Sequence, residues 1–259
     1  MTIDLYNYDL LTIFLVSAAL VLVCSEIGRR LGVRTADRGG KNISTLESAI
    51  LALLALMIGF TFAMALSRFE GRREAVLHEA NAIGTTALRA RLLPPPHRAE
   101  ALKLLREYVQ IRLDLTQRVS SPMDLSATIA RSNEIQEALW QQAKAVAGKD
   151  SGLVPTGLFI QTLNEMIDSQ ETRLTALRNR VPNIVLLALY GIAAVASGFT
   201  GYASGLEARR SRLPVYITSI LICAVILLIQ DLDRPGAGFI KTSQQPMVDT
   251  AASIAGYTD

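Results

Sequence analysis

The stretch that decides the fold reads GFTFAMALSRFEGRREAVLHEANAIGTTALRARLLPPP and runs from Gly59 to Pro96. It begins as lipid-soluble sequence and becomes densely charged at Arg68, yet no Gly-Pro turn or Ser/Asn cluster marks the change. The residues between Arg68 and Arg91 all tolerate a helix. The prolines at 94–96 remove backbone donors and restrict the residue before them. We therefore predict one long helix that leaves a membrane and continues until these prolines.

Four apolar blocks are present in this chain of 259 residues, of which 50% are hydrophobic. A membrane-spanning helix needs ~20 mainly apolar residues. The blocks cover residues 8–24, 49–66, 184–202 and 215–229. The N-terminal flank MTIDLYNYD contains two aspartates and no Lys or Arg, which favours a retained span over a cleaved signal peptide. We predict an all-α integral membrane protein with transmembrane helices 1 and 2 in residues 1–66 and helices 3 and 4 in residues 183–230.

A mostly polar insert, residues 67–182, separates the second and third spans. The spacing of apolar residues and prolines in the insert indicates four helices. The last helix has apolar residues at alternating steps of three and four, interrupted by one polar layer at Gln170. We predict an antiparallel four-helix bundle outside the membrane. Residues 231–259 are predicted to form an interfacial or extramembrane tail.

The membrane orientation follows from the loops. With four spans, the N-terminus, the insert and the tail share one side, and two short basic loops share the other. The positive-inside bias counts short loops most heavily. It predicts a multi-pass protein of the bacterial inner membrane whose short loops are cytoplasmic, with the insert and both termini periplasmic or extracellular. Six arginines lie near span ends on the insert side and weigh against this orientation: Arg68, Arg72, Arg73, Arg173, Arg178 and Arg180.

Small residues recur every three or four positions in the second and third spans, and such stripes let helices approach closely in lipid. We predict that the two spans pack tightly, within a protomer or between protomers, and that the protein forms a homo-oligomer. The alternative is that Gly and Ala are simply common in membrane helices. The packing residues are Gly59, Ala63, Gly191, Gly198 and Gly201.

The span centres lack charge between residues 51 and 66 and between residues 184 and 202. Proton relays usually need ionisable groups at mid-depth, whereas a channel can be gated by an apolar constriction. Phe60, Phe62 and Met64 are candidates for such a constriction, although helix geometry prevents Phe60 and Phe62 from facing the same way. Packing against lipid or core is the alternative role for each.

A charged cluster is expected at the membrane boundary, because LIQDLDRPGAGF ends the fourth span at the depth where the second span becomes polar. We hypothesise that Asp231 and Asp233 pair with Arg68, Arg72 or Arg73, which follow the second span. The alternative is that both groups are anchors that face water. The cluster comprises Arg68, Glu70, Arg72, Arg73, Asp231, Asp233 and Arg234.

The polar residues of the long helix form no recognisable catalytic or metal-binding motif. His78-Glu79 lacks the second histidine of a zinc-protease helix, because Ala82 stands in its place. Glu79 and Asn81 could line a vestibule above a pore, or satisfy each other or helix neighbours in the bundle. No catalytic, metal or cofactor motif is recognisable, so we do not expect an enzyme. A net charge of +3 without a basic stripe also gives no reason to expect a nucleic-acid partner.

Two long segments carry a family resemblance. The opening stretch, extended through HRAEALKLLREYVQIRL, and the segment DLDRPGAGFIKTSQQPM closely resemble a bacterial membrane family of unknown function labelled bestrophin-like. The resemblance covers most of the chain from residue 59 to about residue 248. The matching positions are Arg68, Phe69, Arg72, Arg73, Glu79, Asn81, Gly84, Asp231, Asp233, Arg234 and Pro235.

The resemblance implies an oligomeric, multi-span ion channel with helical extramembrane parts, and anions are the expected ions because bestrophins conduct them. The acidic calcium clasp of animal bestrophins is not recognisable here, and a bestrophin plan places both termini in the cytoplasm, opposite to the orientation derived above. The alternative function is a membrane-anchored sensor or scaffold whose bundle binds a ligand or partner outside the cytoplasm. A purely structural assembly factor is a third reading.

Overall fold

The computed structural model describes residues 4–36, 43–117, 122–149, 154–207, 212–236 and 238–257, and these residues form helices and no strand. The expected all-α class is therefore confirmed. The chain divides into two compact units, one of residues 1–69 with 180–241 and one of residues 70–179 with 242–259. The elements are η1 (Leu5–Asn7), α1 (Leu10–Thr35), α2 (Ile43–Ala90), α3 (His97–Gln117), α4 (Pro122–Ala147), α5 (Val154–Arg178), α6 (Asn183–Leu206), α7 (Leu213–Asp233) and α8 (Gln245–Ala255).

Four helical segments of the described residues are long and apolar enough to cross a membrane, which confirms the expected number of spans. The first span is longer than its apolar block suggested. Asp9 begins α1 by accepting a hydrogen bond from the backbone N–H of Leu11, and the helix then continues past Cys24 to Thr35. The polar residues that follow the apolar block therefore extend the helix and do not end it.

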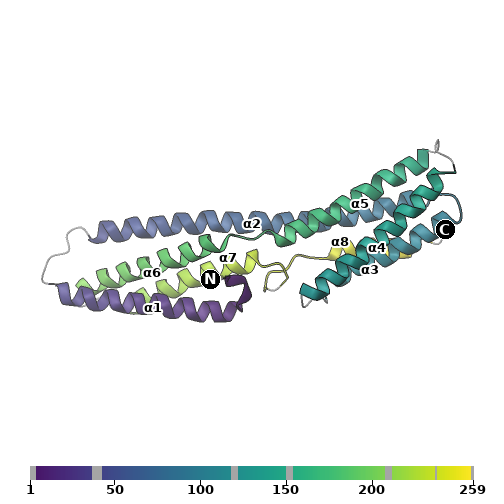
Figure 1. Cartoon of the computed structure of the whole chain (residues 1–259). Helices are drawn as coiled ribbons and strands as arrows, with labels where there is room; N and C mark the ends of the chain where they lie inside the picture. Colours follow the sequence, from purple (N-terminus) through teal and green to yellow (C-terminus); the bar gives the residue numbers. More distant parts are fainter. Residues whose placement is uncertain are drawn as a thin grey trace. The chain divides into compact units, whose positions relative to one another are not determined.

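The long second helix is confirmed. α2 is a single helix of 48 residues, Ile43–Ala90, and Figure 1 shows it as one unbroken ribbon. The change from apolar to charged residues at Arg68 leaves the helix intact, because this segment has no proline and a long helix tolerates the single Gly71. The helix ends four residues before Pro94, in two turns closed by the carbonyls of Arg89 and Ala90.

The first unit contains α1, α6, α7 and the N-terminal part of α2. α6 contacts both α1 and α7, and α1 also contacts α7. The core of this unit is made mainly of aliphatic side chains, including Val21, Leu54, Leu186, Leu189 and Ile226.

The closest helix contact in this unit joins α1 to α6. A Cβ atom added at Gly28 would lie 2.0 Å from the backbone oxygen of Gly198, and one added at Gly201 would lie 2.1 Å from that of Ser25. Gly32 and Gly205 continue the contact in the same way. Small residues thus bring the two backbones together, as the sequence pattern predicted for α6.

The helix that packs on the glycines of α6 differs from our expectation. Gly198 and Gly201 of α6 pack on α1 and not on α2, because α1 supplies its own glycines at a matching spacing of four. A Cβ atom at Gly59 or Gly191 would meet nothing within 4 Å, and Ala63 is exposed. Packing of the second span on the third within one protomer is therefore wrong for these residues. Packing between protomers stays a prediction.

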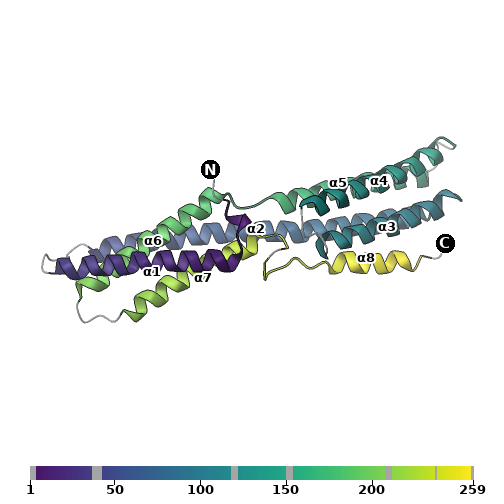
Figure 2. The same ribbon diagram turned by 60° about the horizontal axis from the view of Figure 1, so that its bottom comes forward.

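The second unit contains α3, α4, α5, α8 and the part of α2 that begins at Glu70. α4 contacts α3 and α5, and α8 contacts α3, beside which it lies in Figure 2. Ile83, Leu105, Leu139, Phe159 and Leu163 are among its buried core residues. The helix α8 was not expected, since residues 231–259 were predicted only to form an interfacial or extramembrane tail; the two parts of this tail belong to different units. The position of the second unit outside the membrane stays a prediction.

Candidate functional site

The residues of the predicted boundary cluster fall in both units. Asp231, Asp233, Arg234 and Arg68 belong to the first unit, whereas the positions 70, 72 and 73 belong to the second. Asp231 and Asp233 lie in the last turn of α7, and both side chains are buried together with Arg234.

Asp233 joins three segments of the first unit. Its Oδ2 accepts a hydrogen bond from the hydroxyl of Tyr6 and another, 2.7 Å long, from the backbone N–H of Val181. The Tyr6 hydroxyl also lies 3.0 Å from the backbone oxygen of Val181. Burial, followed by the hydrogen bond to Asp233, raises the pKa of Tyr6 well above its ordinary value. The aspartate therefore fixes the N-terminal segment and the entry to α6 against the end of α7.

Asp231 closes the turn that follows α7. Its two carboxylate oxygens accept hydrogen bonds of 2.8 Å and 3.0 Å from the backbone N–H groups of Phe239 and Ile240. A Cβ atom at Gly238 would lie 2.1 Å from Oδ1 of Asp231, so this close approach requires a glycine. Gly236 adopts a φ of +78°, which side chains rarely allow. Asp231, Gly236 and Gly238 thus belong to a tight turn that is held by a carboxylate.

Two arginines surround the ring of Tyr6 in the same region. The guanidinium of Arg180 lies 4.8 Å from the ring centroid and that of Arg234 lies 5.9 Å from it. Arg234 also donates a 2.8 Å hydrogen bond to the backbone oxygen of Leu5. Asp231 and Asp233 each accept hydrogen bonds from backbone N–H groups, and Asp233 also accepts one from Tyr6. Their proposed pairing with Arg68, Arg72 or Arg73 stays a prediction. Tyr6 was the partner that sequence reasoning missed.

Glu79 lies in the core of the second unit and is completely buried. Its carboxylate accepts hydrogen bonds of 2.6 Å from Nε of Arg112 on α3 and 2.5 Å from Nη1 of Arg173 on α5. A buried carboxylate cannot line an open vestibule, so that role is wrong for Glu79; the second interpretation, partners within the bundle, describes it. Asn81 is exposed and remains available for a vestibule.

A second polar network surrounds the layer predicted at Gln170, which is buried. The Oε1 atom of Gln170 accepts hydrogen bonds from the hydroxyl of Tyr108 at 3.0 Å and from the amide of Gln136 at 3.2 Å, and its own amide donates to Asn133 at 2.9 Å. Burial raises the pKa of Tyr108, so its hydroxyl remains protonated. The network joins α3, α4 and α5 through satisfied polar groups.

The second unit also contains a small cavity of about 20 Å³, lined by Arg72, Val76, Arg173, Leu177, Thr242 and Gln244. Arg173 donates a 2.9 Å hydrogen bond to Oε1 of Gln244 at this cavity. Burial lowers the pKa of Arg173, because a charged guanidinium is poorly solvated there. The sequence analysis did not single out Arg112, and it named Arg173 only for its position near a span end, since helical arginines usually face solvent.

The aromatic residues proposed for a constriction have different environments. Phe60 is 65% exposed and Phe62 is 37% exposed, whereas Met64 packs against the core of the first unit. Phe60 therefore projects from α2 with most of its side chain exposed. Met64 is less suited to a constriction, since its side chain is already in contact with core residues.

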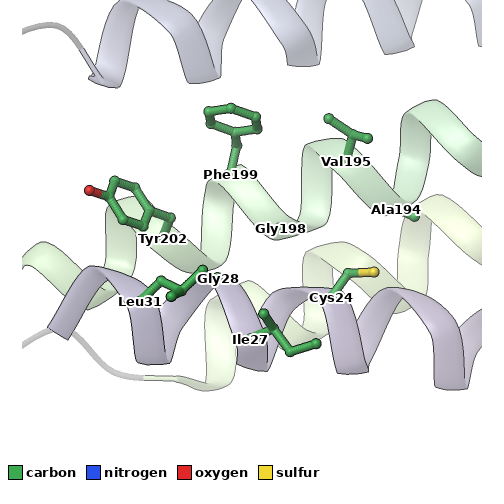
Figure 3. Close-up of a pocket in the computed structure, with 9 residues that line it drawn as sticks. All are labelled: Cys24, Ile27, Gly28, Leu31, Ala194, Val195, Gly198, Phe199 and Tyr202. Carbon is green, nitrogen blue, oxygen red and sulfur yellow. The ribbon is translucent and has the colours of Figure 1, made fainter. Parts of the chain in front are cut away.

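An apolar groove of about 410 Å³ lies where α1 and α6 meet (Figure 3). Cys24, Ile27 and Leu31 of α1 and Val195 and Phe199 of α6 are among its lining residues. Tyr202 also lines it, and its hydroxyl lies 2.9 Å from Oγ1 of Thr35. This groove offers an apolar surface and no titratable cluster. In the described ranges, no group of three or more His, Cys, Asp or Glu side chains could hold a metal ion.

The fold and the four apolar helical segments define an integral membrane protein whose described secondary structure is helical. Residues 14–247 match the bestrophin-like domain, so the chain belongs to the bestrophin-like family, which is known for ion channels. No curated protein matches the sequence.

The solved structures confirm this fold. Crystal structures of a bacterial bestrophin homolog from Klebsiella pneumoniae are similar to this chain. One single-substitution variant shares 17% identity, with 95% of this chain and 96% of that chain covered at a TM-score of 0.66. Another shares 15% identity at the same coverage and a TM-score of 0.67. The structure phased with zinc shares 16% identity, again at the same coverage, with a TM-score of 0.63.

Proposed function

We propose that this protein assembles into a homo-oligomeric ion channel of the bacterial inner membrane in which α2 lines the pore. The observation that carries the proposal is the uncovered face of α2. Its small residues at steps of three and four are all exposed: Ser48, Ala52, Ala55, Gly59, Ala63 and Ser67. The opposite face of the same helix is buried through Leu54, Thr61 and Ala65.

An exposed face of small side chains on an apolar helix suits either close contact with another copy of the chain or a narrow permeation path. Phe60 projects beside this face, so symmetric copies would form a ring of aromatic side chains. Membership of a family known for channels supports the same role. Asn81, farther along α2, would lie beyond the constriction on the side of the insert.

Two observations favour opposite charges for the conducted ion. The family resemblance favours anions. Within α2, however, Glu70 and Glu74 are both exposed and follow Ser67 at steps of three and four. Rings of carboxylates favour cations. Reversal potentials under a salt gradient distinguish the two selectivities, and exchange of both glutamates for glutamine shifts the reversal potential if they act on the ion.

Reconstitution of the purified protein into liposomes, followed by ion-flux measurement, tests conduction. We expect protein-dependent flux that increases when Phe60→Ala widens the constriction. Phe62→Ala is the matched control, because Phe62 is less exposed and faces another direction. An intact oligomer that conducts no ion at any voltage would contradict the channel and would favour the sensor or scaffold.

A further inference from the structure

The groove between α1 and α6 (Figure 3) presents an apolar surface to the outside of the first unit. Ile27 and Leu31 form its wall on α1, and Val195 and Phe199 form its wall on α6. Three of these side chains, Ile27, Leu31 and Val195, are about half exposed, and none of the described residues that line the groove carries a charge. Because both helices are long and apolar enough to span a membrane, this surface is in contact with hydrocarbon.

One end of the groove is polar, where α1 and α6 approach the short loops. Tyr202 lines the groove there, and its hydroxyl lies 2.9 Å from that of Thr35. Arg34 is exposed and follows Ile27 by about two helical turns, so the two residues lie on the same side of α1. The apolar surface thus leads first to two hydroxyls and then to a cation, which is the order of polarity along a phospholipid from its acyl chain to its headgroup.

The walls of the groove are better suited to a hydrocarbon chain than to another helix. Gly28 and Gly198, which lie between the walls and carry no side chain (Figure 3), are already used for the contact of α1 with α6. The side chains that remain are bulky aliphatic and aromatic groups, whereas helix contacts in lipid favour small residues on both partners. A flexible acyl chain can follow such an uneven surface.

The charge at the polar end favours an anionic headgroup. Arg30 pairs with Glu26, and Glu26 also accepts a hydrogen bond from Tyr216 on α7, so this carboxylate is already engaged. Arg34 adds an exposed positive charge one turn farther along α1. Basic residues at the ends of membrane helices attract anionic lipids. A headgroup phosphate therefore complements Arg34.

We propose that this groove binds an anionic phospholipid, with one acyl chain between Leu31 and Phe199 and the headgroup phosphate on Arg34. The hydroxyls of Thr35 and Tyr202 then lie at the level of the ester groups. The bound lipid covers the apolar surface that α1 and α6 leave exposed beside their contact. This site requires only that the chain spans a membrane, so it depends neither on ion conduction nor on membrane orientation.

Fluorescence quenching by brominated lipids tests the site. Trp140 is the one tryptophan of the chain and belongs to the second unit, so Trp140→Phe combined with Phe199→Trp places a single fluorophore in the groove. The full chain is reconstituted into phosphatidylcholine vesicles. We expect phosphatidylglycerol with brominated acyl chains to quench the fluorescence at a several-fold lower mole fraction than brominated phosphatidylcholine. Equal quenching by the two lipids would overturn the headgroup preference, and no quenching by either would show that protein covers the groove.

A second fluorophore position controls for general enrichment of anionic lipid around the protein. Ile217→Trp in the same Trp140→Phe background is the matched variant, because Ile217 is 49% exposed on α7 and does not line the groove. We expect the two brominated lipids to quench this variant equally. The same preference for phosphatidylglycerol at both positions would contradict a site in the groove.

Removal of single charges tests the role of Arg34. Arg34→Gln should abolish the preference for phosphatidylglycerol that the Phe199→Trp reporter detects. Arg212→Gln removes an exposed charge directly before α7 and should retain the preference. An equal loss in both variants would indicate general attraction to the basic loops and would overturn the assignment to Arg34.

Native mass spectrometry of the wild-type protein in detergent gives a measurement that needs no variant. We expect phosphatidylglycerol to remain bound at a several-fold lower lipid concentration than phosphatidylcholine. Equal retention of the two lipids, or retention of neither, would also contradict the proposal.

Discussion

The carboxylate of Glu79 on α2 lies 2.6 Å from Nε of Arg112 on α3, and both side chains are completely buried. Glu79 is also bonded to Arg173 on α5, so one carboxylate joins three helices of the second unit. Ion pairs in a core do not by themselves prove a stabilising role, but the loss of one partner leaves the other charge uncompensated. The three residues are therefore expected to act as a unit.

Glu79→Gln keeps the shape of the side chain and removes its charge, which leaves both arginines without their counterion. We expect a loss of ~3–5 kcal/mol in the free energy of unfolding. Chemical denaturation of the purified protein in detergent measures it. Glu74→Gln is the control, since Glu74 is exposed on the same helix. Equal stability of the two variants would show that the buried ion pairs are dispensable.

Tyr6 and Asp233 should be energetically coupled, because the tyrosine hydroxyl donates to the buried carboxylate. We expect Tyr6→Phe and Asp233→Asn each to lower stability, and the double variant to lose less than the two single losses combined. A double-mutant cycle by thermal unfolding measures this coupling. Tyr8→Phe serves as the control, because Tyr8 is 51% exposed. Strict additivity would exclude a direct interaction.

Gly28→Ala should separate α1 from α6, because the new Cβ atom would lie 2.0 Å from a backbone oxygen. We expect a marked fall in melting temperature and in the yield of folded protein. Gly59→Ala is the matched change on α2, where a Cβ atom meets nothing within 4 Å, and it should leave the fold intact. If both variants unfold at the same temperature as the wild type, the α1–α6 contact is not as close as described.

The exposed face of α2 should touch other copies of the chain. In a protein whose Cys24 and Cys223 have been replaced by serine, Ala63→Cys is expected to give disulfide-linked dimers in membranes under mild oxidation. Leu54→Cys is the control, because Leu54 is buried within the protomer. Gel electrophoresis without reductant measures the linkage. A monomer in both cases would argue against oligomer contacts through this face.

Membrane orientation is tested by a reporter enzyme that works only outside the cytoplasm, fused after Lys149. We expect activity, because the short basic loops should be cytoplasmic and the insert should lie on the opposite side. An inactive fusion at normal expression would contradict the predicted orientation and would agree with the membrane topology of bestrophins, in which both termini are cytoplasmic.

The sequence by itself determined the number of spans, the unbroken α2 and the polar layer at Gln170, because helix breakers, apolar block length and heptad spacing are local properties of the chain. It also indicated that glycines of α6 would mark a close helix contact.

Only the tertiary structure decided which elements meet. Matching glycines on α1 made it the partner of α6, and the fold placed Arg112 and Arg173 around Glu79. The same is true of Tyr6 and Asp233, which are separated by 227 positions in the chain. Helical spacing shows which residues share a face, but it does not show what that face contacts. The contacts of a face depend on the shape and charge of segments that are distant in the sequence. For this reason Glu79, which appeared suited to a vestibule, is buried between two arginines.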